Sequence, residues 1–240
     1  MLKRLFLFLL TNLLIVTTIS ILITVLGLHH YFSANGINYI TLAVVCFIWR
    51  SSGAFISLLM SKWVAKTAMG VELVESDQTS PHARALIQLV STLSKKAGLT
   101  TPPEVGIYHS SELNAFATGP SRTSSLLAVS TGLLQNLNHA EVEGVIGHEI
   151  SHIANGDMVT MTLILGVVNS FSLFLSRLIA YTIATATSRG DHEDGFSSGV
   201  YFILTLVFDI LFTLLGSMLV ATFSRYREYR ADAGGAKLCR

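Results

Sequence analysis

The pentapeptide His148-Glu149-Ile150-Ser151-His152 indicates what kind of domain this chain folds into. On a helix, residues four positions apart project from the same face, so both imidazoles can reach one metal ion. The glutamate between them can act as a general base toward a water molecule at that metal. The pattern is typical of zinc peptidases. We therefore expect His148 and His152 to be metal ligands and Glu149 to be the base.

The residues around the pentapeptide predict that it lies on a capped helix. Asn138 and Glu141 have the spacing of a capping box, in which each side chain binds the other residue's backbone amide. Apolar residues then recur at helical spacing up to Ile153, and Asn155-Gly156 is a typical C-terminal stop. A buried helix with two ordinary core histidines is the alternative interpretation.

Composition and apolar runs predict a membrane protein. Of the 240 residues, 51% are hydrophobic and 13% are charged, and the mean hydropathy is +0.57. Four apolar segments reach the roughly 20 residues that a helix needs to cross a bilayer core. They are residues 5–28, 37–60, 159–187 and 200–223. The first is longer than the apolar core of a signal peptide, so we expect it to be a retained anchor.

The distribution of positive charge predicts the orientation of these segments. Lysine and arginine residues precede the first span and follow the second and fourth, whereas the loop between the first and second spans has none. By the positive-inside rule, both termini and residues 61–157 are cytoplasmic, which in a bacterium means the inner membrane. The lipid bilayer is therefore an expected partner. The net charge of +1 gives no reason to expect a nucleic-acid partner.

The expected fold is an α-helical membrane protein with four transmembrane helices and a small α+β cytoplasmic zinc-peptidase domain. Its predicted parts are a transmembrane hairpin, the cytoplasmic domain, a second hairpin and a cytoplasmic helix. They cover residues 1–60, 61–157, 158–223 and 224–240.

Within the cytoplasmic domain, the sequence predicts a helix, a small sheet and then the helix of the pentapeptide. Ser80-Pro81 is a typical helix start, and Gly98 is a typical stop. Strands are expected at residues 104–109, 113–118 and 126–130, and a turn over residues 119–125.

A catalytic zinc site needs a third protein ligand, and Glu228 is the candidate. Glu228 and Asp232 are four residues apart, so on a helix they share a face. Glu228 can bind the metal while Asp232 binds the second ring nitrogen of a ligand histidine. Two membrane spans separate His152 from Glu228, and an even number returns the chain to the same side of the membrane. A solvated, charged end of a membrane helix is the alternative.

Three segments together resemble the HtpX-type membrane metalloproteases, which are gluzincins related to the CAAX prenyl endopeptidases. They are residues 114–119, 148–157 and 224–232, and the resemblance extends over essentially the whole chain. It implies one zinc ion per chain, bound by His148, His152 and Glu228, with Glu149 as the base. It also implies cleavage of misfolded or damaged membrane proteins at the cytoplasmic face.

The same family resemblance implies further cytoplasmic sequence after the helix that carries Glu228. We therefore expect a chain that ends at Arg240 to be a truncated or natural short form.

Peptide hydrolysis also requires an oriented substrate. We expect Asn114, Ala115, Phe116 and Ala117 to lie in an edge strand, to which an extended polypeptide can add as a further strand. An ordinary core strand is the alternative. The candidate donors for the oxyanion are His109, Arg227 and Tyr229.

Three charged residues lie within the apolar spans: Arg50, Arg177 and Asp209. A charge at the bilayer centre costs about 2.5–3.5 kcal/mol on insertion scales, so each is expected to have a partner. Counted at 1.5 Å per residue from the outer ends of their spans, Arg50 lies roughly 20 Å deep and Asp209 roughly 14 Å deep. We therefore predict an Arg50–Asp209 pair, while Arg177 can extend to the outer interface. Alternatively, each charge faces a water-filled cavity separately.

Two other functions remain open at this point. One is an intramembrane metalloprotease, with the histidines inside a spanning helix and Asp209 as the third ligand. The polar residues Glu141, Glu143 and Asp157 in or next to the motif helix argue against it. The other is a membrane scaffold or transporter that binds a regulatory metal and does not hydrolyse peptides.

Overall fold

The structure is a computed structural model of the chain and describes residues 38–74, 81–187 and 198–240. The chain divides into two compact units. The helical unit contains the described residues up to Phe55 and those of Leu163–Thr222. The sheet unit contains those of Ile56–Thr162 and Phe223–Arg240. The predicted first span, residues 5–28, lies outside the described residues.

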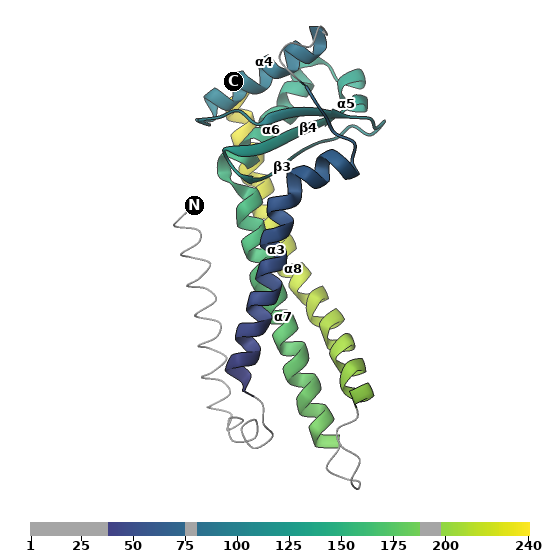
Figure 1. The fold of residues 1–240 in the computed structure, drawn as a ribbon. Helices are drawn as coiled ribbons and strands as arrows, with labels where there is room; N and C mark the ends of the chain where they lie inside the picture. The colour runs from purple at the N-terminus through teal and green to yellow at the C-terminus, as the bar shows by residue number, and fades with distance from the viewer. Residues whose placement is uncertain (1–37, 75–80, 188–197) are drawn as a thin grey trace. The chain divides into compact units, whose positions relative to one another are not determined.

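Three described helices are long and apolar enough to cross a membrane. They are α3 (Tyr39–Ala68), α7 (Asp157–Thr187) and α8 (Ser198–Leu238), and they contain the predicted second, third and fourth spans (Figure 1). A helical membrane protein is therefore confirmed, with three long apolar helices in the described part of the chain.

Helix α8 continues well beyond its predicted span. Its 41 residues extend over about 60 Å at 1.5 Å per residue, roughly twice the thickness of a bilayer core. Residues 224–238 therefore continue α8, so the helix that carries Glu228 runs directly out of the fourth predicted span.

Within the helical unit, small side chains let the helices approach closely. Gly166 of α7 faces Ser51 of α3. The hydroxyl of Ser172 in α7 donates a hydrogen bond of 3.1 Å to the carbonyl of Phe212 in α8. Such contacts are typical of helix packing in lipid, where the hydrophobic effect does not drive association.

The predicted Arg50–Asp209 ion pair is confirmed. Nη2 of Arg50 lies 3.3 Å from Oδ1 and 3.2 Å from Oδ2 of Asp209. The pair joins α3 to α8, so the alternative in which these two charges face separate cavities is wrong.

The sheet unit contains a four-stranded mixed sheet with the strand order β1–β2–β4–β3. Strands β2 (Glu104–Tyr108) and β4 (Ser124–Ser130) are parallel, whereas β1 (Glu72–Leu73) and β3 (Ala115–Ser121) pair antiparallel with them.

The three predicted strands are present. The predicted turn over residues 119–125 is present but shorter, at Arg122-Thr123, because β3 continues through Gly119-Pro120 to Ser121. This edge position tolerates the proline, which has no amide hydrogen to donate.

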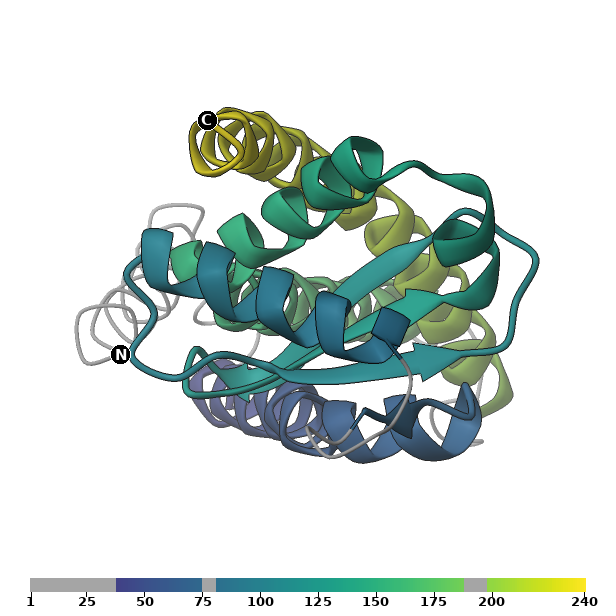
Figure 2. The same ribbon diagram turned by 90° about the horizontal axis from the view of Figure 1, so that it is seen from above.

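Strand β4 is buried on both faces of the sheet. Leu127 and Val129 contact the core beneath α4 (Pro81–Lys96), α5 (Thr131–Asn136) and α6 (His139–Asn155). Leu126 and Ala128 contact a second core that includes Ala65, near the C-terminal end of α3. Figure 2 shows α4 and α6 on one side of the sheet. This uninterrupted apolar strand therefore forms the buried centre of the sheet against which the histidine helix packs.

The boundaries of the short helices differ in part from the predictions. Helix α4 begins at Pro81 as expected, and its predicted cap, Ser80, lies outside the described residues. Helix α5 was not predicted. Its N-cap is Ser130, whose hydroxyl accepts a hydrogen bond of 3.1 Å from the amide of Leu133.

Candidate metal centre

Helix α6 carries the pentapeptide and is capped as predicted. The amide of Asn138 donates to Glu141 at 2.9 Å, and the amide of Glu141 donates to Asn138 Oδ1 at 3.1 Å. Gly156 ends the helix in the left-handed conformation, with φ of 65°, which glycine adopts without steric cost. The apolar face of α6 is buried, and α6 packs against β3 (Figure 1).

Three side chains from two distant segments meet at one point. His148 and His152 project from α6, and their Nε2 atoms lie 3.1 Å apart. Oε2 of Glu228, from α8, lies 3.3 Å from both nitrogens. These three residues form a group that could hold a metal ion, and we call it the donor cluster.

Two further carboxylates hold the outer nitrogens of the histidine rings. Nδ1 of His148 lies 2.9 Å from Oδ1 of Asp232, as the sequence predicted. Nδ1 of His152 lies 2.8 Å from Oδ2 of Asp157, for which sequence reasoning found no role in the site. Asp157 is only 3% exposed and is the first residue of α7. The sequence feature that could have indicated this contact is a carboxylate directly after the glycine that ends α6.

The donor cluster fits a zinc ion. Neutral rings whose Nδ1–H groups donate to carboxylates present only lone pairs at Nε2. Together with Oε2 of Glu228, these nitrogens would repel one another unless a cation lay between them. Ligand atoms about 2.0–2.1 Å from a tetrahedral zinc lie about 3.3 Å apart, close to the separations in the cluster. Two imidazoles and one carboxylate are also a donor set of catalytic zinc sites.

Glu149 lies beside the cluster and faces β3. Burial raises the pKa of the Glu149 carboxyl above its usual value, although the two neighbouring histidines and the backbone amide of Ala117 act against this shift. Burial lowers the pKa of His152, but the hydrogen bond with Asp157 and the charge of Glu228 outweigh it, so the net shift is upward. A carboxyl with a raised pKa holds a proton more readily, as a group that accepts and returns one must.

Two arginines of α8 tie the cluster to the junction of α6 and α7. Nη2 of Arg227 lies 3.3 Å from Oε1 of Glu228, and Nη1 donates to the carbonyl of Asp157 at 3.4 Å. Arg230 donates to Oδ1 of Asn155 at 3.0 Å. Arg227, a candidate oxyanion donor, is therefore engaged with the third member of the cluster.

The other two oxyanion candidates are exposed. Among the described residues, His109 and Tyr229 form no hydrogen bond or ion pair with the donor cluster.

The expected substrate-binding residues lie at the edge of the sheet. Ala115, Phe116 and Ala117 are in β3, the strand at the end of the sheet order. Asn114 immediately precedes β3, and its carbonyl accepts a hydrogen bond of 3.0 Å from the amide of Ser130. The edge of β3 that faces away from β4 is the one available to a further strand.

Close packing of glycines brings α8 against α6. A side chain on Gly234 would meet Ser151, and one on Gly235 would meet the backbone of His148. On α6, a Cβ added to Gly147 would in turn lie 2.8 Å from the sulfur of Cys239. This contact sets the distance between the two histidines and the helix that carries Glu228.

Replacing Gly235 by alanine is expected to push α8 away from α6. The added Cβ would lie 3.0 Å from the nitrogen and 3.2 Å from the Cα of His148, and backbone atoms cannot move aside as side chains do. Overpacking of this kind costs about 1–3 kcal/mol. We expect a lower thermal midpoint and less bound metal per chain, measured by calorimetry and elemental analysis.

Gly144→Ala is the matched control on α6. Its added Cβ has no heavy atom within 4 Å, and a helical glycine-to-alanine change stabilises by about 0.5–1 kcal/mol. Full metal content and an unchanged midpoint in Gly235→Ala would contradict the close packing of the two helices.

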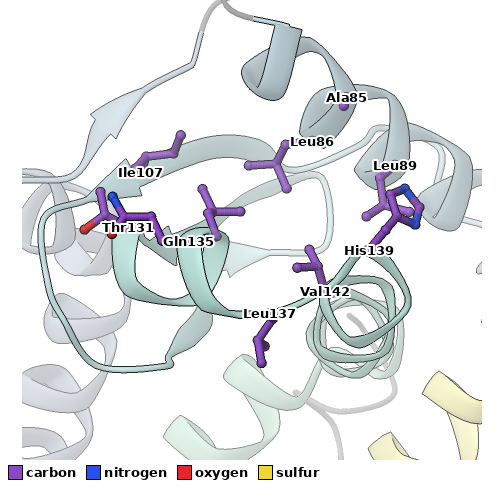
Figure 3. Close-up of a pocket in the computed structure, with 10 residues that line it drawn as sticks. Ala85, Leu86, Leu89, Ile107, Thr131, Gln135, Leu137, His139 and Val142 are labelled. Atoms are coloured by element: carbon purple, nitrogen blue, oxygen red, sulfur yellow. The ribbon is translucent and has the colours of Figure 1, made fainter.

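A separate hollow lies between α4, α5 and the start of α6. It has a volume of about 640 Å³ and is lined mainly by apolar side chains, among them Leu86, Leu89 and Val142 (Figure 3). His139, at the start of α6, is its one imidazole, and none of the donor cluster lines it. The hollow is therefore distinct from the metal centre.

Comparison with known proteins agrees with this geometry. The model of Peptidase family M48 matches residues 80–240. The "Protease HtpX homolog" of Bacillus licheniformis is 51% identical over 98% of this chain and 80% of its own length. The homologue from Chlorobium limicola is 49% identical over 98% of this chain and 80% of its own length.

A solved structure shows the same fold at lower identity. The crystal structure of S. mikatae Ste24p matches with a TM-score of 0.57 and 19% identity, and the match covers 99% of this chain and 57% of that one. The family match and the HtpX homologues, which align over nearly all of the chain, show its membership directly. The chain belongs to peptidase family M48, as a membrane metallopeptidase homologous to HtpX.

Proposed function

We propose that this metallopeptidase is zinc-dependent and cleaves misfolded or damaged membrane proteins at the cytoplasmic face of the bacterial inner membrane. One observation carries the proposal: the donor atoms of His148, His152 and Glu228 lie within 3.3 Å of one another, with Glu149 beside them. Such a site supports metal-dependent peptide hydrolysis, and proteolytic quality control of unfolded polypeptides is the role that we propose for it.

The proposed roles of the residues follow from their contacts. His148, His152 and Glu228 would hold one zinc ion, which as a Lewis acid polarises the peptide carbonyl and acidifies water. Asp232 and Asp157 orient the two imidazole rings and keep their inner nitrogens free to bind the metal. Glu149 accepts a proton from the attacking water and returns it to the leaving amine nitrogen.

The edge of β3 supports an extended polypeptide as the substrate. A peptide that pairs with Ala115–Ala117 forms main-chain hydrogen bonds that do not depend on its sequence. The backbone amide of Ala117 interacts with Glu149, so a peptide along this strand passes the proposed base. Misfolded chains expose such extended segments, whereas folded domains do not.

We also propose four spans with both termini and residues 61–157 in the cytoplasm. The lysines and arginines that flank the spans support this orientation, and the three described apolar helices support the multi-pass arrangement. The bilayer and polypeptide substrates are the proposed partners, and no nucleic acid is proposed.

Two structural facts favour Glu228 over the intramembrane alternative. Both carboxylate oxygens of Asp209 are engaged by Arg50, so Asp209 already has a partner. The histidines lie on α6, which packs on the sheet and has a polar, capped start. A spanning helix would have neither feature.

Hydrolysis of unfolded casein by the full chain in detergent tests the proposed function. We expect cleavage with added zinc, loss of cleavage with a chelator, and recovery when zinc is restored. Zinc binding without any peptide hydrolysis would favour the metal-binding scaffold or transporter.

A further inference from the structure

A cavity with a polar part and an apolar part lies within the helical unit, between α3, α7 and α8. Its volume is about 360 Å³. Its polar lining includes Arg50 from α3, Arg177 from α7, and Thr205 and Asp209 from α8. Polar cavities between apolar helices are rare, and ionisable residues at such places mark binding or transport sites.

The charges of the described residues that line this cavity do not cancel. Asp209 binds Arg50 through both of its oxygens, at 3.2 and 3.3 Å, so each neutralises the other. Arg177 adds a second guanidinium, and the described residues that line the cavity include no second carboxylate. Two arginines and one aspartate give a net charge of +1. A cation in a membrane segment requires an anionic partner or water.

Two buried hydrogen-bond donors in the cavity also lack partners among the residues that the structure describes. They are Nη1 of Arg177 and Oγ1 of Thr205. Both line the cavity, although they come from different helices. Leaving a buried donor unpaired is unfavourable, and an oxyanion would accept a hydrogen bond from each. Guanidinium groups are well suited to phosphate oxygens.

The rim of the cavity is apolar and open. Trp49 is 75% exposed, Phe202 is 68% exposed and Leu206 is 52% exposed, and all three line the cavity. On membrane-spanning helices, such side chains face acyl chains. Thr205 lies seven residues after the start of α8, about 10 Å along the helix, and so near one end of it. A ligand with an anionic head and apolar tails matches this lining.

We propose that the cavity binds the phosphate group of an anionic phospholipid. Arg177 and Thr205 contact the phosphate, Asp209 holds Arg50 beside it, and the acyl chains lie along Trp49 and Phe202. The lipid compensates the unpaired charge that the helices carry into the membrane.

Lipid retention by the purified full chain tests this site. The protein in neutral detergent is mixed with phosphatidylglycerol or with phosphatidylcholine, and bound lipid is counted by native mass spectrometry. We expect retention of phosphatidylglycerol at least about tenfold above phosphatidylcholine. Arg177→Gln is expected to reduce it by about tenfold, the effect of losing one charge-assisted hydrogen bond. Equal retention by the wild type and Arg177→Gln would overturn the proposal.

Three further measurements make the result specific. Arg122→Gln removes a positive charge from an exposed turn of the sheet unit and should change nothing. Thr205→Val keeps the shape of the side chain, so it tests the site through the lost donor even if Arg177→Gln does not fold. Lipid-free protein is titrated with inorganic phosphate; Arg177-dependent binding there, with no preference for phosphatidylglycerol, would assign the site to free phosphate and overturn the lipid as its source.

Discussion

Glu149→Gln is expected to lower peptide hydrolysis by about 10²–10⁴-fold, the usual contribution of general acid–base catalysis. Glutamine has nearly the same shape but cannot accept a proton from water. His148, His152 and Glu228 are unchanged, so the zinc content should stay near one ion per chain. The rate is measured with unfolded casein and the metal by elemental analysis on the same preparation.

Glu143→Gln is the matched control for this variant. It makes the same chemical change on the same helix, and the contacts of Glu143 are with Cys239, whose sulfur donates to its backbone carbonyl and whose pKa its charge helps to raise, and not with the donor cluster. We expect wild-type hydrolysis and wild-type metal content. Cleavage at the wild-type rate by a pure Glu149→Gln protein would exclude Glu149 as the base.

Glu228→Gln is expected to lower the zinc content most strongly among single changes outside α6. Its Oε2 lies 3.3 Å from both inner histidine nitrogens, and the amide removes the charge that would balance the ion. Loss of a carboxylate that binds a ligand histidine costs about 10–100-fold in metal affinity. Loss of a metal ligand itself should cost at least as much. Zinc affinity is measured by competition with a chromophoric chelator.

Asp209→Asn separates this ligand assignment from the intramembrane alternative. Asp209 binds Arg50, so its loss should weaken the helical unit and leave the zinc affinity unchanged. Helical content, followed by circular dichroism, shows whether each variant is folded. The opposite pattern, with zinc lost in folded Asp209→Asn and kept in Glu228→Gln, would replace Glu228 by Asp209 as the ligand.

Features set by local sequence or by the regular geometry of spanning helices were readable from the sequence. The capping box of Asn138 and Glu141 needs only residues within one turn, and it forms as expected. The Arg50–Asp209 pair followed from depth counting, because helices have a fixed rise per residue. The even number of spans between Glu228 and the histidines permitted their contact, which the structure contains.

Features that depend on tertiary contacts were not readable. Strand β1 has only two residues. It forms because it pairs with β2, and its own composition does not predict a strand. The contact of Asp157 with His152 depends on the left-handed conformation of Gly156, which ends α6 directly before Asp157 begins α7.

The donor cluster is divided between segments that lie 76 positions apart, and this has a consequence for biosynthesis. The ribosome completes α6, with both histidines, before it begins the part of α8 that carries Glu228. Until α8 docks through its glycines, the histidines have no third ligand. The nascent chain therefore lacks the part of the metal affinity that depends on folding. Under the proposed function, the protein would therefore be inert until α8 has docked on α6 and completed the donor cluster.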